Sequence, residues 1–403
     1  DANEGWKPQT EEHLGIIEVL GISSGIVVLT KSDKVDADVL QQRQEEIAAR
    51  LETSSVTWHH TVITSVIANT GISELITQIE TLVASQATKS QNARPRLFID
   101  RVFSMKGSGT VVTGTLEGGN LETASSLVVA RTGTAVRVRE IQTHGSVVAV
   151  AQSGSRCAVN LAGIDADELQ RGDALVHEND WHMSNVFDAR IKVLPALQHA
   201  LTHRGSFTLH IGTRSQSATL RILQTENIDP GQSGLVRIRF EHSLPLVPGD
   251  RFLVRDTGIG ATVGGGVILD VDPRGRVKDA APDGSDEQIL RDRGWLTVDE
   301  ARQLTGHDIA PIVGSWVASA ETFRVTVTAL EQQLSTSQSI DTSLLTAFER
   351  DVISTIDGVQ INNGIAIRGE SDPLLSHPYV MQFLQAGVTT PDADKLDRNV
   401  IRQ

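Results

Sequence analysis

The sequence predicts a multidomain chain with part of a doubly wound α/β domain, two antiparallel β-barrels and a C-terminal α+β region of winged-helix type. Three observations carry this prediction. Residues 1–92 alternate helix-like and strand-like segments, residues 96–275 consist of short strands separated by glycine turns, and residues 286–403 combine short helices with a hairpin. A chain of 403 residues is expected to hold several domains, because single cores usually stop growing near ~250–300 residues.

The α/β prediction for residues 1–92 rests on hydrophobic periodicity. Thr10 is expected to cap the first helix, with Glu11 and Glu12 favourable at its positive end. The whole pattern is helix–strand–helix–strand–helix, which is typical of one half of a doubly wound sheet and offers little core. The apolar residues that define the five segments are Leu14, Ile17 and Leu20; Ile26 to Leu29; Leu40, Ile47 and Leu51; Val62 and Ile63; and Ile72, Leu75, Ile76, Ile79, Leu82 and Val83.

A polar linker at 84–93 precedes the two predicted barrels, which we place at 96–180 and 186–275. Each barrel has a strand with alternating arginines, Val136 to Arg139 and Val236 to Arg239, and each has a Gly-Asp turn before a late strand. The first barrel opens with LFIDRVFSMKGSGTVVTGTLEGG at 97–119, which predicts two strands around a turn at 106–109.

A second linker at 276–285 leads to the winged-helix-like region at 286–403. A capping box at Thr297–Glu300 predicts a short helix that ends near Gly306. We expect a strand at Phe323–Thr328 and a hairpin from Val359 to Ile367 around Asn363-Gly364.

The composition favours a cytoplasmic protein that does not associate with membranes. No apolar run approaches the ~18 residues of a membrane span. The single cysteine, Cys157, excludes a disulfide framework and indicates a reducing compartment. Because the first residue is Asp1 rather than Met, we expect the chain to begin within a longer gene product or after processing.

The net charge of −14 argues against broad non-specific binding to nucleic acid, although a locally basic face can still bind RNA. The strand arginines that could form such a face are expected to point to solvent. They are Arg137, Arg139, Arg237, Arg239, Arg251 and Arg255.

Two short segments predict a guanine-binding site. Thr30, Lys31 and Asp33 follow the apolar strand at 26–29, where open α/β sheets bind ligands. The Asp33 carboxylate can accept the ring N–H and the exocyclic amino group of guanine, and Lys31 can lay its stem across the base. Thr64, Ser65 and Val66 end the next strand, where a backbone N–H can meet the guanine carbonyl oxygen.

These segments resemble the two guanine-specificity motifs of GTPases, asparagine-lysine-x-aspartate and serine-alanine-x. Thr30 stands where the first motif has asparagine, and Ser65 stands where the second has alanine. No G-x-x-x-x-G-K-[ST] loop occurs in the sequence. We therefore expect no tight nucleotide binding by this chain, and we assign no catalytic residue and no metal ligand.

Three longer segments resemble translational GTPases in the expected order, and the chain as a whole resembles the selenocysteine-specific translation elongation factors within that superfamily. The segments are DANEGWKPQTEEHL at 1–14, the barrel opening at 97–119, and LPLVPGDRFLVRDTGIGATVGGGVILD at 244–270. The resemblance implies GTP or GDP with Mg²⁺ as ligands of the intact protein, and selenocysteinyl-tRNA and the ribosome as partners. It also implies that the chain is truncated at both ends and lacks the family's catalytic histidine, so that hydrolysis is not expected.

In this family the last winged helices bind an mRNA hairpin beside a UGA codon. The resemblance implies that those modules lie beyond Gln403 and that residues 286–403 form a spacer arm.

The resemblance also places Asp100, Arg101 and Arg156 at the positions of the family's selenocysteine pocket. A selenol is more acidic than a thiol, so the selenocysteine side chain is an anion at neutral pH, which two guanidinium groups stabilise. Asp100 is expected to hold Arg101 in place by a bidentate pair. Serine on the same tRNA is neutral and gains no such attraction.

Other functions remain open from the residues alone. The chain can be a general aminoacyl-tRNA-binding elongation or initiation factor, or a non-catalytic RNA-binding adaptor without a phosphate loop. A GTPase subunit of a sulfate-activating enzyme shares the barrels, but the winged-helix region argues against it.

Overall fold

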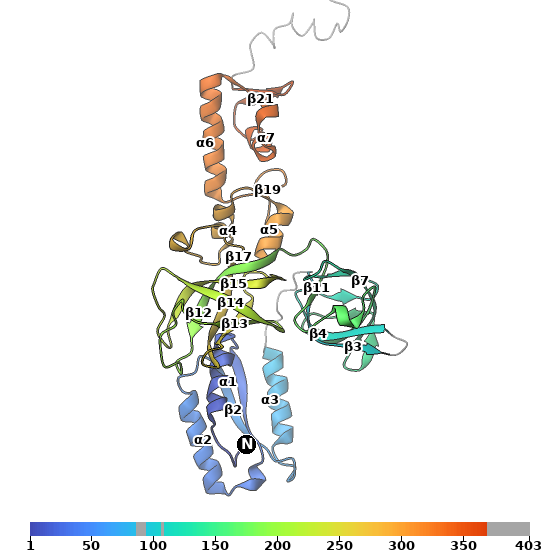
Figure 1. Ribbon diagram of the computed structural model, residues 1–403, viewed down its shortest axis with the longest axis vertical. Coiled ribbons are helices and arrows are strands. Elements are labelled where there is room, and N and C mark those ends of the chain that lie inside the picture. The colour runs from blue at the N-terminus through green and yellow to red at the C-terminus, as the bar shows by residue number, and fades with distance from the viewer. Residues whose placement is uncertain (86–93, 106–108, 369–403) are drawn as a thin grey trace, which may run out of the picture. The chain divides into compact units, whose positions relative to one another are not determined.

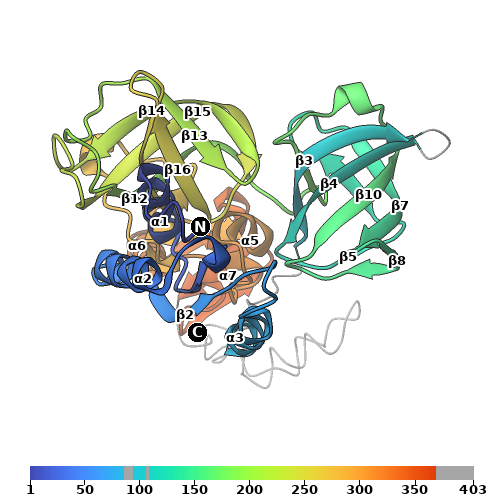
Figure 2. The same cartoon turned by 90° about the horizontal axis from the view of Figure 1, so that it is seen from below.

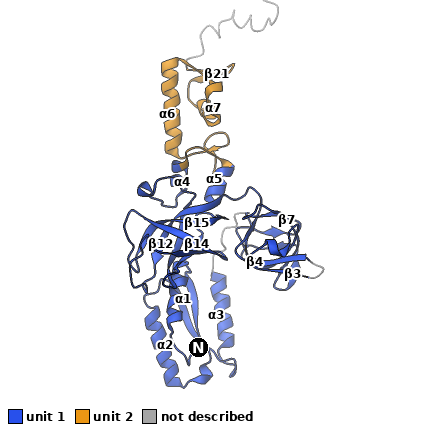
Figure 3. Cartoon of the chain, viewed as in Figure 1, with its two compact units in different colours: residues 1–292, 299–308 blue, residues 293–298, 309–403 orange. Residues whose placement is uncertain are grey.

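The computed structural model describes residues 1–85, 94–105 and 109–368. The chain divides into two compact units, residues 1–292 with 299–308 and residues 293–298 with 309–403 (Figure 3). The first unit holds the α/β segment and both barrels, and the second holds the C-terminal strands and helices (Figure 1). The predicted fold class is confirmed. Most of the linker at 84–93 and of the turn at 106–109 lies outside the described residues.

The α/β segment is built as predicted from helix, strand, helix, strand and helix. The two strands are parallel neighbours, with Leu29 opposite Ile63. The last helix has the predicted amphipathic sequence, yet Ile76, Ile79 and Val83 are 47–66% exposed. The elements are α1 (Pro8–Val19), β1 (Ser24–Leu29), a 3₁₀ turn η1 (Ser32–Lys34), α2 (Ala37–Leu51), β2 (Thr57–Ile63) and α3 (Ile72–Ser85).

The predicted cap at Thr10 is wrong, because α1 begins two residues earlier at Pro8. Proline suits the first helical position, since it has no N–H to leave unsatisfied and its φ is already helical. The N-cap is Lys7, whose side chain makes no capping hydrogen bond. Thr10 lies inside the first turn and donates its own N–H to the Lys7 carbonyl.

Barrel 1 is a closed ring of strands. β10 pairs with β4 on one side and with β7 on the other, which closes the order β10-β4-β3-β11-β6-β7 (Figure 2). Apolar side chains alternate inward and form a continuous core that includes Ile99, Val112 and Leu161. The ring strands are β3 (Arg96–Met105), β4 (Gly109–Glu117), β6 (Ser126–Val129), β7 (Ala135–Thr143), β10 (Arg156–Ala162) and β11 (Ala174–Val176). Smaller pieces are β5 (Leu121–Glu122), β8 (Ser146–Val148) and β9 (Val150–Ala151).

Barrel 2 is also closed, in the order β12-β15-β14-β13-β16-β17. Phe187 is fully buried at its centre, with ring centroids 5.8 Å from Phe240 and 5.2 Å from Phe252. Gly266 permits close strand packing, because a Cβ there would lie 1.9 Å from the Arg190 carbonyl oxygen. The strands are β12 (Met183–Val193), β13 (Phe207–Ile211), β14 (Arg214–Leu223), β15 (Ser233–Pro245), β16 (Arg251–Asp256) and β17 (Ala261–Val271).

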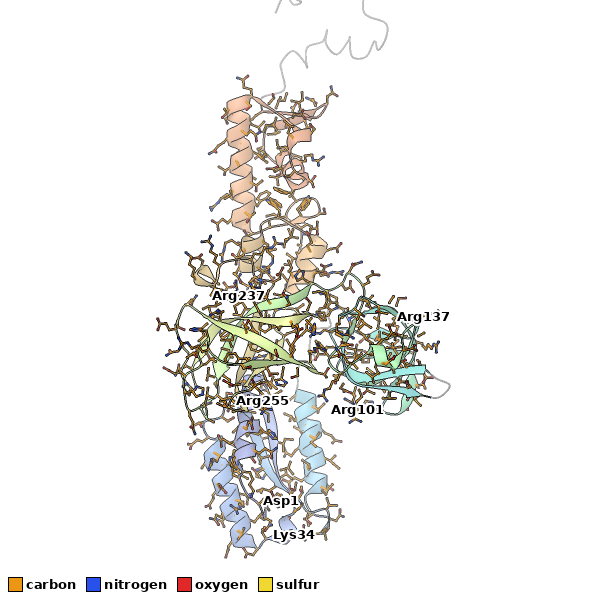
Figure 4. The ribbon with its side chains drawn as sticks, viewed as in Figure 1. Asp1, Lys34, Arg101, Arg137, Arg237 and Arg255 are labelled. Atoms are coloured by element: carbon orange, nitrogen blue, oxygen red, sulfur yellow. The ribbon has the colours of Figure 1, made fainter. Side chains whose placement is uncertain are left out.

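One arginine of the alternating set is not exposed as predicted. Arg137, Arg139, Arg239, Arg251 and Arg255 are exposed, but Arg237 is buried in barrel 2 (Figure 4). Its Nε and Nη2 donate to Asp188 Oδ1 and Oδ2 at 2.6 and 2.8 Å, and Nη1 donates to the Gly275 carbonyl. These hydrogen bonds to Asp188 raise the pKa of Arg237 despite its burial. The sequence pattern did not reveal the partner, because Asp188 lies on β12, the neighbouring strand in space.

The two barrels are joined through a second buried arginine. Arg96, at the start of β3, donates from Nη1 and Nη2 to the two carboxylate oxygens of Asp250, each at 2.7 Å. It also donates to Glu117 at 2.9 Å and to the Pro245 carbonyl at 2.7 Å. Asp250 belongs to the Gly-Asp turn of barrel 2, so this turn residue anchors barrel 1.

The C-terminal unit contains a helix, a strand, a second helix and a hairpin, in the manner of a winged-helix module. Trp295 stacks on Phe348 with ring centroids 4.9 Å apart. The predicted hairpin is confirmed, and its turn residues Asn363 and Gly364 both have positive φ, at 48° and 80°. The elements are β18 (Leu296–Thr297), β19 (Trp316–Val317), α6 (Ala320–Ser337), β20 (Ser339–Asp341), η4 (Thr342–Leu344), α7 (Ala347–Ile353), β21 (Val359–Asn362) and β22 (Ile365–Arg368).

The predicted strand at Phe323–Thr328 is wrong, since these residues lie inside the helix α6. The β-branched residues favoured a strand, but Ser319 caps the helix by accepting the Thr322 N–H, and Leu330 and Leu334 are buried on one face. The predicted helix ending near Gly306 is confirmed as α5 (Val298–Thr305), which follows α4 (Asp286–Arg293). No helix in the described ranges has the length and apolar character needed to cross a membrane.

Replacing Arg237 with alanine should strongly destabilise the chain, because Asp188 would be left as a buried, unpaired carboxylate. Breaking a buried pair in this way costs about 3–5 kcal/mol. The free energy of unfolding, measured by urea titration, should fall accordingly. Arg239→Ala, on the same strand but exposed, is the matched control and should change stability by less than about 0.5 kcal/mol. Equal losses in the two variants would contradict the structural role of the Arg237 pair.

Candidate functional site

The structure brings the two predicted guanine-binding segments to one edge of the sheet. Thr30, Lys31 and Asp33 follow β1, and the segment 64–66 follows β2. The strands are parallel neighbours, so their carboxyl ends lie side by side. A backbone hydrogen bond of 3.2 Å from Ser32 N–H to the Thr64 carbonyl joins the segments directly.

The Asp33 carboxylate is held by Ser65. The Ser65 hydroxyl donates to Asp33 Oδ1 at 2.5 Å and accepts the Ala68 N–H at 3.0 Å. Ser65 is almost completely buried, whereas Asp33 is exposed. In the part of the chain that the structure describes, no hydrogen bond reaches Asp33 Oδ2. The carboxylate is therefore fixed in orientation and still open to a ligand.

The hydrogen bond between Ser65 and Asp33 changes which residues correspond to the serine and the alanine of the serine-alanine-x motif. It is Ser65, and not Thr64, that reaches Asp33, so the geometry favours Ser65 as the motif's serine and Val66 in place of its alanine. The Ser65 N–H is already bonded to the Thr70 carbonyl at 3.1 Å. Of the three residues expected here, Val66 is then the one whose N–H can meet a guanine carbonyl oxygen, and its side chain is 84% exposed.

Lys31 has an unusual backbone conformation, with φ 59° and ψ 41° in the left-handed region. Such values are uncommon outside glycine and cluster at functional sites. Its Nζ lies 2.7 Å from Asp1 Oδ2, and its side chain is 62% exposed, so the aliphatic stem is available to a planar base. Asp1 lies in the same α/β segment (Figure 4). Thr30 is exposed, and its carbonyl accepts the Ala2 N–H at 2.8 Å.

The predicted aminoacyl residues occur around a β-bulge in barrel 1. In the β3–β4 pair, Ile99 lies opposite Gly114 and Arg101 lies opposite Thr113, so Asp100 is the extra residue. A bulge interrupts the pleat and redirects a side chain. Arg156 begins β10, on the other side of β4. Three adjacent strands thus contribute to one patch.

The bidentate pair expected between Asp100 and Arg101 is wrong, because Asp100 pairs with Arg156. Arg156 Nη1 and Nη2 donate to Asp100 Oδ2 and Oδ1 at 2.5 and 3.0 Å. Burial alone would raise the pKa of Asp100. The hydrogen bonds from Arg156 and Thr113, with the charges of Arg156 and Arg101, outweigh burial and hold that pKa below its usual value. The carboxylate therefore stays ionised at neutral pH.

Arg101 remains free in this arrangement. It is exposed on barrel 1 and forms no hydrogen bond or ion pair with the described residues (Figure 4). It is close enough to Asp100 for its charge to lower the pKa of that carboxyl. Asp100, Arg101 and Arg156 together carry a net charge of +1 at neutral pH, which suits an anionic ligand.

Sequence reasoning missed Thr113. Its hydroxyl donates to Asp100 Oδ1 at 2.6 Å and fixes the carboxylate from the strand between β3 and β10. The predicted β3–β4 hairpin could have suggested a residue opposite Asp100. The bulge shifts the pairing of β3 with β4 by one residue, however, and no pattern in the sequence indicates a bulge at this position.

Two family models match the chain. Residues 1–85 match the GTP-binding domain of elongation factor Tu, and residues 188–275, which cover most of barrel 2, match the β-barrel domain of selenocysteine-specific elongation factors. Both the α/β segment and a barrel are thereby linked to translational GTPases.

Curated relatives agree with these models. The selenocysteine-specific elongation factor of Desulfomicrobium baculatum is 37% identical over 320 residues, which cover 75% of this chain and 50% of the relative. The protein of the same name from Methanocaldococcus jannaschii is 30% identical over 240 residues, covering 59% and 51%. The chain therefore spans about half the length of these relatives. An elongation factor 1-alpha from Methanosphaera stadtmanae is 29% identical over 308 residues, covering 67% of this chain and 73% of that relative.

Solved structures share the fold. A bacterial selenocysteine-specific elongation factor superposes with a TM-score of 0.70 at 24% identity, covering 96% of this chain and 69% of its own. The factor SelB from Methanococcus maripaludis, in complex with a GTP analogue, gives 0.59 at 24% identity, covering 70% and 65%. The curated relatives and the two family models show that the chain belongs to the family of selenocysteine-specific elongation factors within the translational GTPases.

Proposed function

We propose that this chain is part of a GTP-dependent translation elongation factor that delivers selenocysteinyl-tRNA to the ribosome at UGA codons. The observation that carries the proposal is the patch on barrel 1, where the Asp100–Arg156 pair lies beside the uncompensated Arg101. The names of the relatives support the same function for the longer proteins to which they belong.

The patch distinguishes amino acids by charge. A selenocysteine side chain is ionised at neutral pH and gains electrostatic energy from Arg101 and from the outer face of Arg156. Asp100 holds the Arg156 fork in one orientation, and Thr113 holds Asp100, so little side-chain entropy is lost when the anion binds. A seryl group is neutral and leaves the arginine charges without a partner.

Guanine recognition is assigned to the edge formed by β1 and β2. Asp33 accepts two donors of the base, Lys31 covers its face, and the Val66 N–H meets the carbonyl oxygen. The fit is supported by the fixed yet open Asp33 carboxylate. The same site accepts GDP and GTP, because these residues contact only the base.

Magnesium belongs to the phosphate end of such a nucleotide, where it neutralises charge. The described residues bring no group of three metal-ligating side chains together. We assign no described residue to phosphate or metal.

The same proposal assigns the RNA and ribosome partners. The aminoacyl-tRNA and the ribosome are partners of the intact factor. An mRNA hairpin is a further partner of the intact factor, and residues 286–403 are assigned to a spacer arm.

Arg156→Ala should abolish most of the preference for selenocysteinyl-tRNA over seryl-tRNA charged on the same tRNA. Loss of one charge-assisted contact predicts a fall in this preference of roughly tenfold or more. The measurement is equilibrium binding of both aminoacyl-tRNAs to the chain, followed by fluorescence of a label on the tRNA. Arg101→Ala should act in the same direction.

Arg137→Ala is the matched control. Arg137 is an exposed arginine on β7 and pairs with Ala162 at the far end of β10 from Arg156. It should leave the preference unchanged. A preference that survives in both Arg101→Ala and Arg156→Ala would favour a general aminoacyl-tRNA carrier instead.

Asp33→Asn should shift nucleotide preference from guanine toward xanthine. The amide presents a donor where the carboxylate accepted one, and xanthine has an oxygen at the position of the guanine amino group. The ratio of affinities for GDP and XDP, measured by competition in this chain or in a longer form that binds more tightly, should invert. Asp36→Asn, which alters an N-cap of α2 outside the site, should not change the ratio. An unchanged ratio in Asp33→Asn would refute the guanine assignment.

A further inference from the structure

A cavity of about 430 Å³ lies between barrel 1 and barrel 2, apart from both sites described above. Barrel 1 contributes Arg94, Arg96 and the turn at Gly154, and barrel 2 contributes the turn at Gly249. The indole of Trp181 forms part of its wall. Added Cβ atoms at Gly154 and Gly249 would meet nothing within 4 Å, so the missing side chains leave the space open. The volume falls within the range of small-molecule sites.

Three of the residues that line this cavity carry buried hydrogen-bond donors without a partner. Arg94 and Arg96 are 2% and 5% exposed and both lie over the Trp181 ring, with guanidinium carbons 4.4 and 4.7 Å from its centroid. Arg94 Nε and Nη2, Arg96 Nε and Trp181 Nε1 are buried without a hydrogen-bond partner. Among the described lining residues, no buried side-chain acceptor is left unsatisfied. Buried donors without partners are costly, which indicates that a bound group supplies acceptors.

The two arginines differ in charge balance. Arg96 is neutralised by Asp250 and Glu117. Arg94 donates from Nη1 to the Arg302 carbonyl at 2.6 Å and forms no ion pair with the described carboxylates. Burial lowers the pKa of Arg94 to about 10, opposed by the more distant charge of Asp180, so the group is still a cation at neutral pH. Asp180 and Asp308, both among the described residues, act on Arg94 only through their charges and form no ion pair with it, and a buried cation without a direct partner favours an anion in the adjoining space.

We propose that this cavity binds a small anion through its phosphate group, either as free phosphate or as a phosphate ester. Arginine presents a planar fork of donors that matches phosphate oxygens, and the several donors on this wall suit a group with several acceptors. Because both barrels line the cavity, the bound anion ties one barrel to the other. The proposal does not depend on the function proposed above.

The experiment measures binding to the chain by isothermal titration calorimetry, with sodium chloride at equal ionic strength as the reference. Inorganic phosphate, pyrophosphate and AMP are titrated separately, and AMP is used so that the guanine edge is not engaged. Saturable binding of one anion per chain is expected, together with a raised Tm. Binding of inorganic phosphate alone identifies free phosphate as the source, and tighter binding of AMP identifies an ester.

Arg94→Gln should weaken this binding by roughly tenfold or more, as expected for loss of a charged donor. Arg137→Gln, an exposed arginine of the same barrel, should bind like the unaltered chain. Trp181→Phe keeps the ring and removes the Nε1–H donor, so its affinity should fall several-fold.

Two results would overturn the proposal. One is the absence of saturable binding of all three anions to the unaltered chain, which would mean that water fills the cavity. The other is an affinity that Arg94→Gln leaves unchanged. If circular dichroism shows that Arg94→Gln does not fold, an unchanged affinity in Trp181→Phe decides against the proposal.

Discussion

The buried contact between Arg96 and Asp250 is the interaction on which the first unit depends. It joins the first strand of barrel 1 to a turn of barrel 2 through two hydrogen bonds of 2.7 Å each. Asp173, in the matching turn of barrel 1, binds Arg131 and lies 4.0 Å from Arg214 of barrel 2. The Gly-Asp turns of the two barrels therefore perform the same task, since each places a carboxylate against arginines beside the barrel contact. A buried pair of this kind is strongly unfavourable to break, because the remaining charge has no water to solvate it.

The contact between the two barrels is connected to the proposed aminoacyl patch through hydrogen bonds to the backbone of β3. Thr213 of barrel 2 donates its hydroxyl to the Ile99 carbonyl at 2.6 Å, and the Ile99 N–H donates to the Asp173 carbonyl. Ile99 is the residue immediately before the bulge at Asp100. Hydrogen bonds and the backbone of β3 therefore connect the contact between the barrels to the bulge at Asp100. The Asp100 carboxylate in turn holds the guanidinium group of Arg156. The position of the free Arg101 charge is set by a structure that both barrels support.

The sequence was sufficient for the architecture, but not for the pairing of distant side chains. Periodicity predicted the helices and strands of residues 1–85 and the hairpin at 359–367, because these signals are local. The strand expected at Phe323–Thr328 failed, because packing of Leu330 and Leu334 overrode the preference of β-branched residues. The Asp100–Arg156, Arg237–Asp188 and Arg96–Asp250 pairs each join residues at least 49 positions apart. Such contacts depend on strand order and register, which a single sequence does not encode in any local pattern.

The central claim is that barrel 1 selects its aminoacyl group by negative charge, and a comparison of selenocysteine with cysteine tests it most directly. The two amino acids have nearly the same shape, and both are joined to the same tRNA by a non-hydrolysable amide. Binding to the chain is measured from neutral to alkaline pH. We expect selenocysteine to bind much more tightly at neutral pH, and the difference to narrow as the pH rises through about 8.5, where a free thiol ionises. A difference that stays constant across this range, or no difference at neutral pH, would contradict selection by charge.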